Sequence, residues 1–88
     1  MSPDAVISSP LLRARQSAAP LADAARVALD VDARLAPGAT LDDMRAVVTC
    51  RGETIVTVGH EPDCSEIVFE LTGRDVRFPA GGFHEVEL

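Results

Sequence analysis

The sequence is most constrained by two short apolar runs that each end at a turn and pass directly into a helix. The first run is AVIS at residues 5–8, followed by Ser9-Pro10; the second is TIVTV at 54–58, followed by GHEP at 59–62. The continuous β-branching of the second run is typical of a strand covered on both faces, as in a parallel sheet. The pattern predicts an α/β domain in which right-handed helical crossovers join the strands.

Periodicity and capping residues predict the first helix. Small apolar residues recur at three- and four-residue steps to about Leu29, with Ser9 as the N-cap and Pro10 in the first helical position. Because Pro20 lacks a backbone donor, we expect it to kink or split this helix near residues 16–19.

The remaining elements have their own local signals. Thr40 predicts the start of a helix over 41–49, and Gly73 predicts the end of a third helix that begins near Pro62. Asp63 lies in that third helix, on a face that reads as solvated. Weaker strand signals lie at 31–35, 76–78 and 83–88.

Composition excludes several classes of protein. The chain has 88 residues and a formal net charge of −6, which argues against nucleic-acid binding through phosphate neutralisation. No apolar run approaches the roughly 20 residues of a membrane span, and no signal peptide is evident. Cys50 and Cys64 read as free thiols, and no spacing typical of metal ligands occurs. We therefore expect a cytoplasmic protein that contacts neither membrane nor nucleic acid and needs no metal or cofactor.

The two turns carry the candidate chemistry. If the strands before them are parallel neighbours, Arg13 and His60 converge at the carboxyl edge of the sheet, beside two helix N-termini. Unpaired N–H groups, a guanidinium and an imidazole together favour a phosphate-like anion, and Gly59 would let the backbone approach it. The alternative is that Arg13 forms a surface ion pair and His60 is a satisfied turn histidine.

The segments "SSPLLRARQSA" and "VGHEP" resemble two signature blocks of the histidine phosphatase superfamily, whose fold is phosphoglycerate-mutase-like. The nearest subgroup is the SixA-type phosphohistidine phosphatases, and the resemblance continues through "RLAPGAT" and "LTG". It implies a three-layer α/β/α sandwich with a mostly parallel sheet. It also implies a phosphatase that acts on a phosphorylated protein or a small phosphorylated molecule, with phosphoryl transfer through a covalent phosphohistidine.

The resemblance implies a role for three residues. Arg13 would clamp the phosphoryl group in a bidentate contact, and His60 would be the second active-site histidine, which stabilises charge on the phosphoryl oxygens. The backbone N–H of Glu61 would be a further phosphate donor. Arg15 is a weaker candidate for contact with the anion, and the Glu61 carboxyl is a weaker candidate for a general acid.

The chain departs from the family at one block. Nothing in it corresponds to the Arg-His-Gly that carries the nucleophilic histidine, and His84, the other histidine, is expected in a strand. We therefore expect residues 1–88 to form a single partial domain that lacks its N-terminal block and the opening internal strand of its sheet. Such a chain should be inactive alone. The alternative function is a non-catalytic remnant that at most binds phosphate-like anions. We also expect self-association through exposed strand edges.

Overall fold

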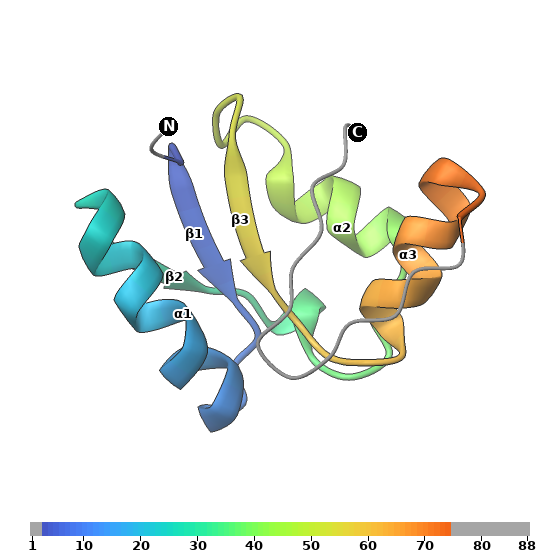
Figure 1. The fold of residues 1–88 in the computed structure, drawn as a ribbon, viewed down its shortest axis with the longest axis horizontal. Coiled ribbons are helices and arrows are strands. Elements are labelled where there is room, and N and C mark those ends of the chain that lie inside the picture. The colour runs from blue at the N-terminus through green and yellow to red at the C-terminus, as the bar shows by residue number, and fades with distance from the viewer. Residues whose placement is uncertain (1–2, 75–88) are drawn as a thin grey trace.

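The computed structural model describes residues 3–74, in which three strands alternate with helices (Figure 1). The elements are β1 (Ala5–Ser8), α1 (Leu12–Ala25), β2 (Leu29–Val31), the short 3-10 helix η1 (Ala33–Leu35), α2 (Leu41–Val48), β3 (Ile55–Val58) and α3 (Asp63–Thr72).

The three strands form one parallel sheet in the order β2-β1-β3. Val6 pairs with Leu29 on one side and with Val56 on the other, so β1 is flanked by both partners. All four residues of β1 are buried, as expected for a strand with neighbours on both edges and helices over both faces. The predicted α/β fold with a parallel sheet is confirmed, and it is consistent with part of a phosphoglycerate-mutase-like fold.

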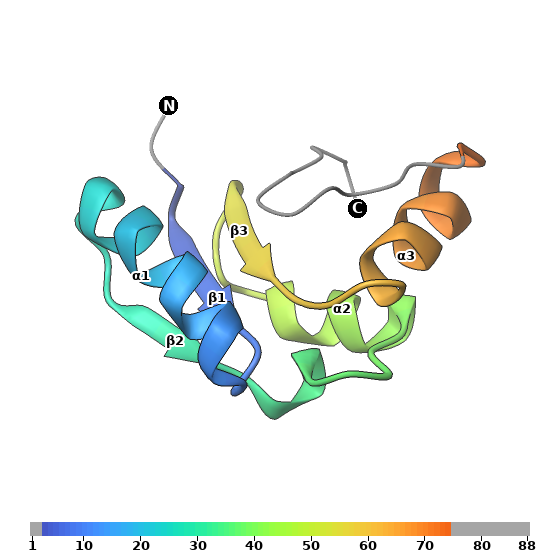
Figure 2. The same ribbon diagram turned by 60° about the horizontal axis from the view of Figure 1, so that its bottom comes forward.

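Helices lie on opposite sides of the sheet: α1 on one side and α2 on the other, with α3 beyond α2 (Figures 1 and 2). Because side chains alternate along a strand, β1 contributes to two apolar clusters. Val6 packs with Ala18 and Ala22 of α1, whereas Ile7 packs with Leu35 and Val47. The small residues of α1 let the helix lie close to the sheet. A core of aliphatic side chains, almost without aromatic residues, can therefore fill the space between them.

The first helix differs from its predicted limits at both ends. It begins at Leu12, with Leu11 rather than Ser9 at the N-cap position, and it ends at Ala25. Arg26 adopts a left-handed conformation with φ of 58°, and its N–H bonds to the carbonyls of the last turn, which closes the helix. Pro20 does not split the helix; it lies on an exposed position, where water can hydrate the carbonyl whose donor is missing.

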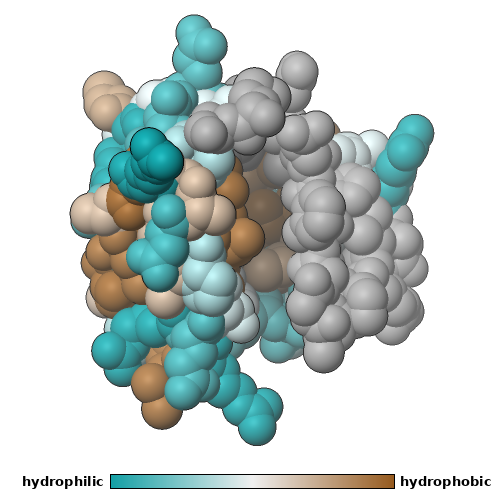
Figure 3. Space-filling view, turned by 60° about the vertical axis from the view of Figure 1, so that its left-hand side comes forward, coloured by the Kyte–Doolittle hydropathy of each residue, from teal (hydrophilic) through white to brown (hydrophobic). Residues whose placement is uncertain are grey.

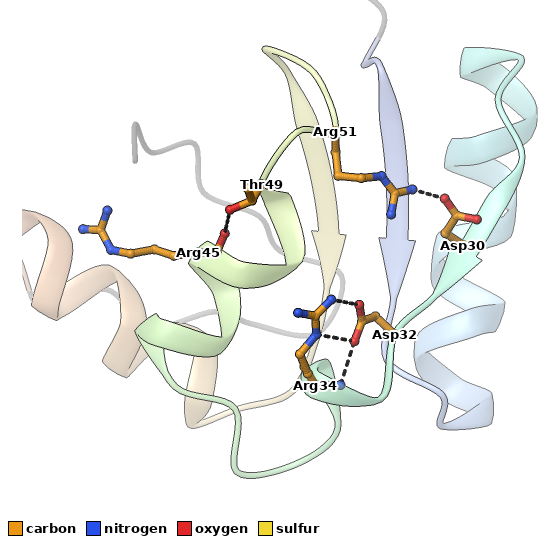
Figure 4. A network of polar contacts seen from close by, with 6 residues as sticks. All are labelled: Asp30, Asp32, Arg34, Arg45, Thr49 and Arg51. Carbon is orange, nitrogen blue, oxygen red and sulfur yellow. Dashed lines mark hydrogen bonds and ion pairs between the residues drawn. The ribbon is translucent and has the colours of Figure 1, made fainter.

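The strand predicted at 31–35 is also displaced. Because α1 closes early, Leu29 begins β2, and the strand ends at Val31. The carboxylate of Asp32 then accepts from the backbone N–H of Arg34 at 2.9 Å and forms an ion pair with its guanidinium, which starts η1 (Figure 4). A second ion pair joins Arg51 to Asp30 of β2.

The second and third helices follow their local signals closely. Thr40 and Asp43 form a reciprocal capping box at the start of α2, and Gly73 closes α3 with φ of 73°. The strands predicted at 76–78 and 83–88 lie outside the described residues, as does His84. Within residues 3–74, none of the helices has the length and apolar character that crossing a membrane requires.

Candidate anion-binding site

The carboxyl ends of β1 and β3 bring the two predicted turns together. The backbone N–H of Ser9 donates to the carbonyl of Val58 at 2.9 Å, which extends the β1–β3 ladder by one bond. Immediately beyond it, Nε2 of His60 lies 2.7 Å from Oγ of Ser9. The prediction that these strands are parallel neighbours is confirmed, and His60 contacts the turn that opens α1.

Ser8 and Ser9 are both fully buried, which is uncommon for serine. Ser8 Oγ donates to the Ser9 carbonyl at 2.7 Å, and Ser9 Oγ accepts from the Leu11 N–H at 3.2 Å. Both hydroxyls therefore form hydrogen bonds within the turn, although Ser9 is not the N-cap that the sequence predicts. The contact between Ser9 and His60 was not predicted; the signal for it was the position of both residues, directly after two neighbouring strands.

Arg13 lies in the first turn of α1 and is exposed. Its side chain makes no hydrogen bond or ion pair within residues 3–74, so the alternative of a surface ion pair is not observed there. It also forms no hydrogen bond with His60 in that range; Ser9, four residues earlier, links their two turns. The face that carries α1 mixes hydrophilic and apolar side chains (Figure 3), and Leu11 and Leu12 are exposed beside Arg13.

The turn after His60 is closed by its own side chains. The His60 carbonyl accepts from the Cys64 N–H at 2.9 Å, and the Glu61 carboxylate accepts from the Ser65 N–H at 2.9 Å and from its hydroxyl. The Glu61 carboxylate is therefore engaged with Ser65 in the first turn of α3, which does not favour its interpretation as a general acid. Its backbone N–H, the predicted phosphate donor, has no partner within residues 3–74.

Asp63 corrects the prediction of a solvated helix face, because its side chain is buried. One carboxylate oxygen accepts from the backbone N–H groups of Gly38 at 2.7 Å and Ala39 at 3.2 Å. The contact ties the loop before α2 to the first turn of α3, two residues after Glu61. Asp63 thus fixes the helix that begins beside His60.

The charges around the site act in opposite directions. Asp63 and Glu66 in the first turn of α3 offset the attraction of that helix N-terminus for an anion. The first turn of α1 carries no acidic residue and contains Arg13. An anion at this edge would therefore depend on α1 and on the guanidinium.

Cys64 lies against Gly59, where a Cβ would be 3.5 Å from Sγ. Burial raises the pKa of the Cys64 thiol, and the carboxylates of Glu61 and Asp63 raise it further. Cys50 is exposed, and both cysteines are free, as predicted. Among the residues the structure describes, no group of three or more histidine, cysteine or acidic side chains could hold a metal ion.

Comparison with protein families bears on the first of the two turns. Residues 1–37 match the model of the histidine phosphatase superfamily, branch 1. The match contains β1, Ser9, Arg13 and all of α1, and it stops before His60. No curated protein and no solved structure matches the chain.

The family match supports a phosphatase-type function at the level of the superfamily. It does not separate the SixA-type subgroup from other members of branch 1. His60 lies outside the matched residues, but it contacts Ser9, which lies within them.

Proposed function

We propose that this chain supplies the phosphate-binding part of a histidine phosphatase site, at the carboxyl edge of β1 and β3. The observation that carries the proposal is the 2.7 Å contact between Nε2 of His60 and Oγ of Ser9. This contact places the imidazole against the turn that leads to Arg13, within the segment that matches the superfamily.

Each proposed contact has a chemical reason. The guanidinium of Arg13 can give two parallel N–H bonds to phosphoryl oxygens, and the His60 imidazole can donate one more. The N–H of Glu61 would add a backbone donor. Phosphoryl transfer depends mainly on positioning and on neutralising the charge of the transferring group, which is what such donors provide.

Hydrolysis would need a nucleophile that these 88 residues do not show. Their sequence contains no Arg-His-Gly, and His60 is engaged with Ser9. In the complete reaction a nucleophilic histidine would form an N–P bond as the bond from phosphorus to the leaving group breaks, and water would then cleave that N–P bond. We propose that this chain takes part in the reaction only together with an Arg-His-Gly segment.

The proposed substrates are a phosphohistidine-bearing protein, as in the SixA-type subgroup, or a phosphomonoester. Exposed Leu11 and Leu12 beside Arg13 favour a substrate that extends beyond its phosphate, since such side chains can contact the rest of a bound molecule. The alternative function is non-catalytic binding of phosphate-like anions, and the missing Arg-His-Gly favours it for the 88 residues alone.

Calorimetric titration of the 88-residue protein with orthovanadate tests the binding role. We expect weak binding that Arg13→Ala abolishes, and no hydrolysis of p-nitrophenyl phosphate. Arg45→Ala is the matched control, because it removes the same charge from an exposed position on α2 that the proposal does not involve. Equal affinity in the Arg13→Ala variant would refute the proposed site.

The mass of the native protein in its source cells separates the two functions. A mass several kilodaltons above 9.3 kDa, with added residues that include Arg-His-Gly, would support the phosphatase. A mass equal to that of the 88 residues would favour the anion-binding alternative.

A further inference from the structure

We propose that Ser9 is a positioning residue that holds the proton of neutral His60 on Nδ1, so that Nδ1–H faces the ligand. The assignment of the proton rests on the hydrogen bonds of Ser9. Only its use toward a phosphoryl group rests on the proposed function.

The hydroxyl of Ser9 has a defined direction. Its oxygen accepts from the Leu11 N–H, which can only donate, and it lies 2.7 Å from Nε2 of His60. Because Ser9 is fully buried, its hydroxyl hydrogen needs an acceptor within the protein. Among the hydrogen bonds of residues 3–74, the acceptor within its reach is Nε2, so the hydroxyl donates and Nε2 accepts.

The second ring nitrogen follows from the first. In a neutral imidazole with Nε2 as acceptor, the proton is on Nδ1. Nδ1 makes no hydrogen bond within residues 3–74, and no side-chain nitrogen or oxygen there is buried without a partner, so Nδ1 reaches solvent. If the ring gains a second proton, Nε2–H donates to the serine oxygen instead, and Nδ1 still carries a hydrogen. Nδ1 is therefore a donor in both states.

The position of Ser9 is independent of His60. Its N–H is held by the Val58 carbonyl at 2.9 Å, and its own carbonyl is held by the Ser8 hydroxyl at 2.7 Å. The serine is therefore fixed first, and it determines the orientation of the imidazole ring. A donor set in place before the ligand arrives needs little reorganisation when it binds.

Long-range ¹H–¹⁵N NMR of the 88-residue protein tests the assignment, at about pH 8, above the ordinary range of an imidazole. His84→Gln identifies the signals of His60. We expect the pattern of a protonated Nδ1 in the wild type, and loss of that preference in Ser9→Ala. Ser17→Ala is the control, because it removes a serine hydroxyl from an exposed position on α1 that has no hydrogen bond to the turn or the ring within residues 3–74; it should keep the wild-type pattern.

Orthovanadate titration of the same variants measures the consequence for binding. Ser9→Ala should lower the affinity by roughly five- to tenfold, the typical effect of one hydrogen bond, and Ser17→Ala by less than about twofold. A wild-type ring protonated on Nε2, or an unchanged tautomer in Ser9→Ala, would overturn the role of Ser9. Vanadate binding that survives Arg13→Ala would overturn the proposed function and leave the tautomer assignment standing.

Discussion

The two ends of the sheet are built differently. At the amino end, Asp4 donates its N–H to the Thr54 carbonyl at 2.7 Å, and its carboxylate accepts from the N–H groups of Glu53 and Thr54. Gly52 is folded tightly over Asp4 with φ of 128°. At the carboxyl end, Arg13 has no partner within residues 3–74, and Nδ1 of His60 reaches solvent.

The difference separates stability from binding. At the amino end, the carboxylate of Asp4 is used within the protein, where it holds the N–H groups of Glu53 and Thr54. At the carboxyl end, polar groups remain available beside the N-terminus of α1, which is where parallel α/β sheets bind their ligands. Substitutions at the amino end should therefore change unfolding more than anion affinity, whereas those near His60 should change both.

The largest effect is expected from Gly52→Ala. A Cβ at this position would lie 2.5 Å from the Asp4 Cβ, in a backbone conformation that L-residues rarely adopt. We expect a loss of about 2–4 kcal/mol in the free energy of unfolding, measured with urea. Gly38→Ala is the control, since it shares a positive φ but has open space around it, and it should cost about half as much. Equal losses in the two variants would show that the steric conflict with Asp4 adds nothing to the cost of the backbone conformation, which would contradict the close packing at this end.

Asp63→Ala should have the next largest effect, on both properties. It leaves two loop N–H groups without their acceptor, for a cost of about 1–3 kcal/mol in unfolding free energy. It should also weaken vanadate binding, because losing the contacts that fix the helix beside His60 outweighs the removal of one negative charge from the first turn of α3. Asp63→Asn keeps an acceptor oxygen and should lose less. Full affinity in a destabilised Asp63→Ala protein would break the proposed coupling at this end.

Acid unfolding should show the smaller contribution of Asp32. The side-chain and backbone hydrogen bonds from Arg34 lower the pKa of Asp32 to about 2. Because its pKa in the unfolded chain is about 4, the stabilisation is present above that pH and is lost as the pH falls toward 2. The pair is partly exposed, so we expect less than about 1 kcal/mol. Asp32→Asn should flatten the pH dependence of Tm in this window, and an unchanged slope would contradict this.

Asp4→Asn should have the smallest effect. Hydrogen bonds from the backbone of Thr54 and Glu53 lower the pKa of Asp4, so its contribution is likewise lost on acidification. The carboxylate is fully exposed, and water can replace it at both donors. We expect a slight fall in Tm at pH 7 and unchanged vanadate affinity. A change in affinity would contradict the separation of the two ends.

The sequence predicted those elements whose signals are local. The strand before Gly59, the N-cap at Thr40 and the glycine that closes α3 are each specified by a few neighbouring residues. The limits of α1 and β2 were predicted wrongly, because they depend on the left-handed Arg26 and on the side chain of Asp32. Neither conformation is specified by hydrophobic periodicity.

The meeting of the two turns at one edge of the sheet was predicted from the sequence. Strand-end placement put Arg13 and His60 at one edge, but the contact of Ser9 with His60 depends on the register of two strands separated by α1, β2 and α2. The buried role of Asp63 depends on a loop 25 residues earlier in the chain. Such partners become visible only when the tertiary fold is known.

The strand order also has a kinetic consequence. Val6 pairs with Leu29 in β2, which is near in the chain, and with Val56 in β3, which is distant. The contact of Ser9 with His60 also joins residues that are 51 positions apart. Closing longer loops costs more chain entropy, and folds rich in distant contacts form slowly. We expect β1 and β2 to join around α1 first and β3 to dock last. The imidazole would then reach its serine only in the final step of folding, so the Ser9–His60 contact would report that the whole sheet has formed.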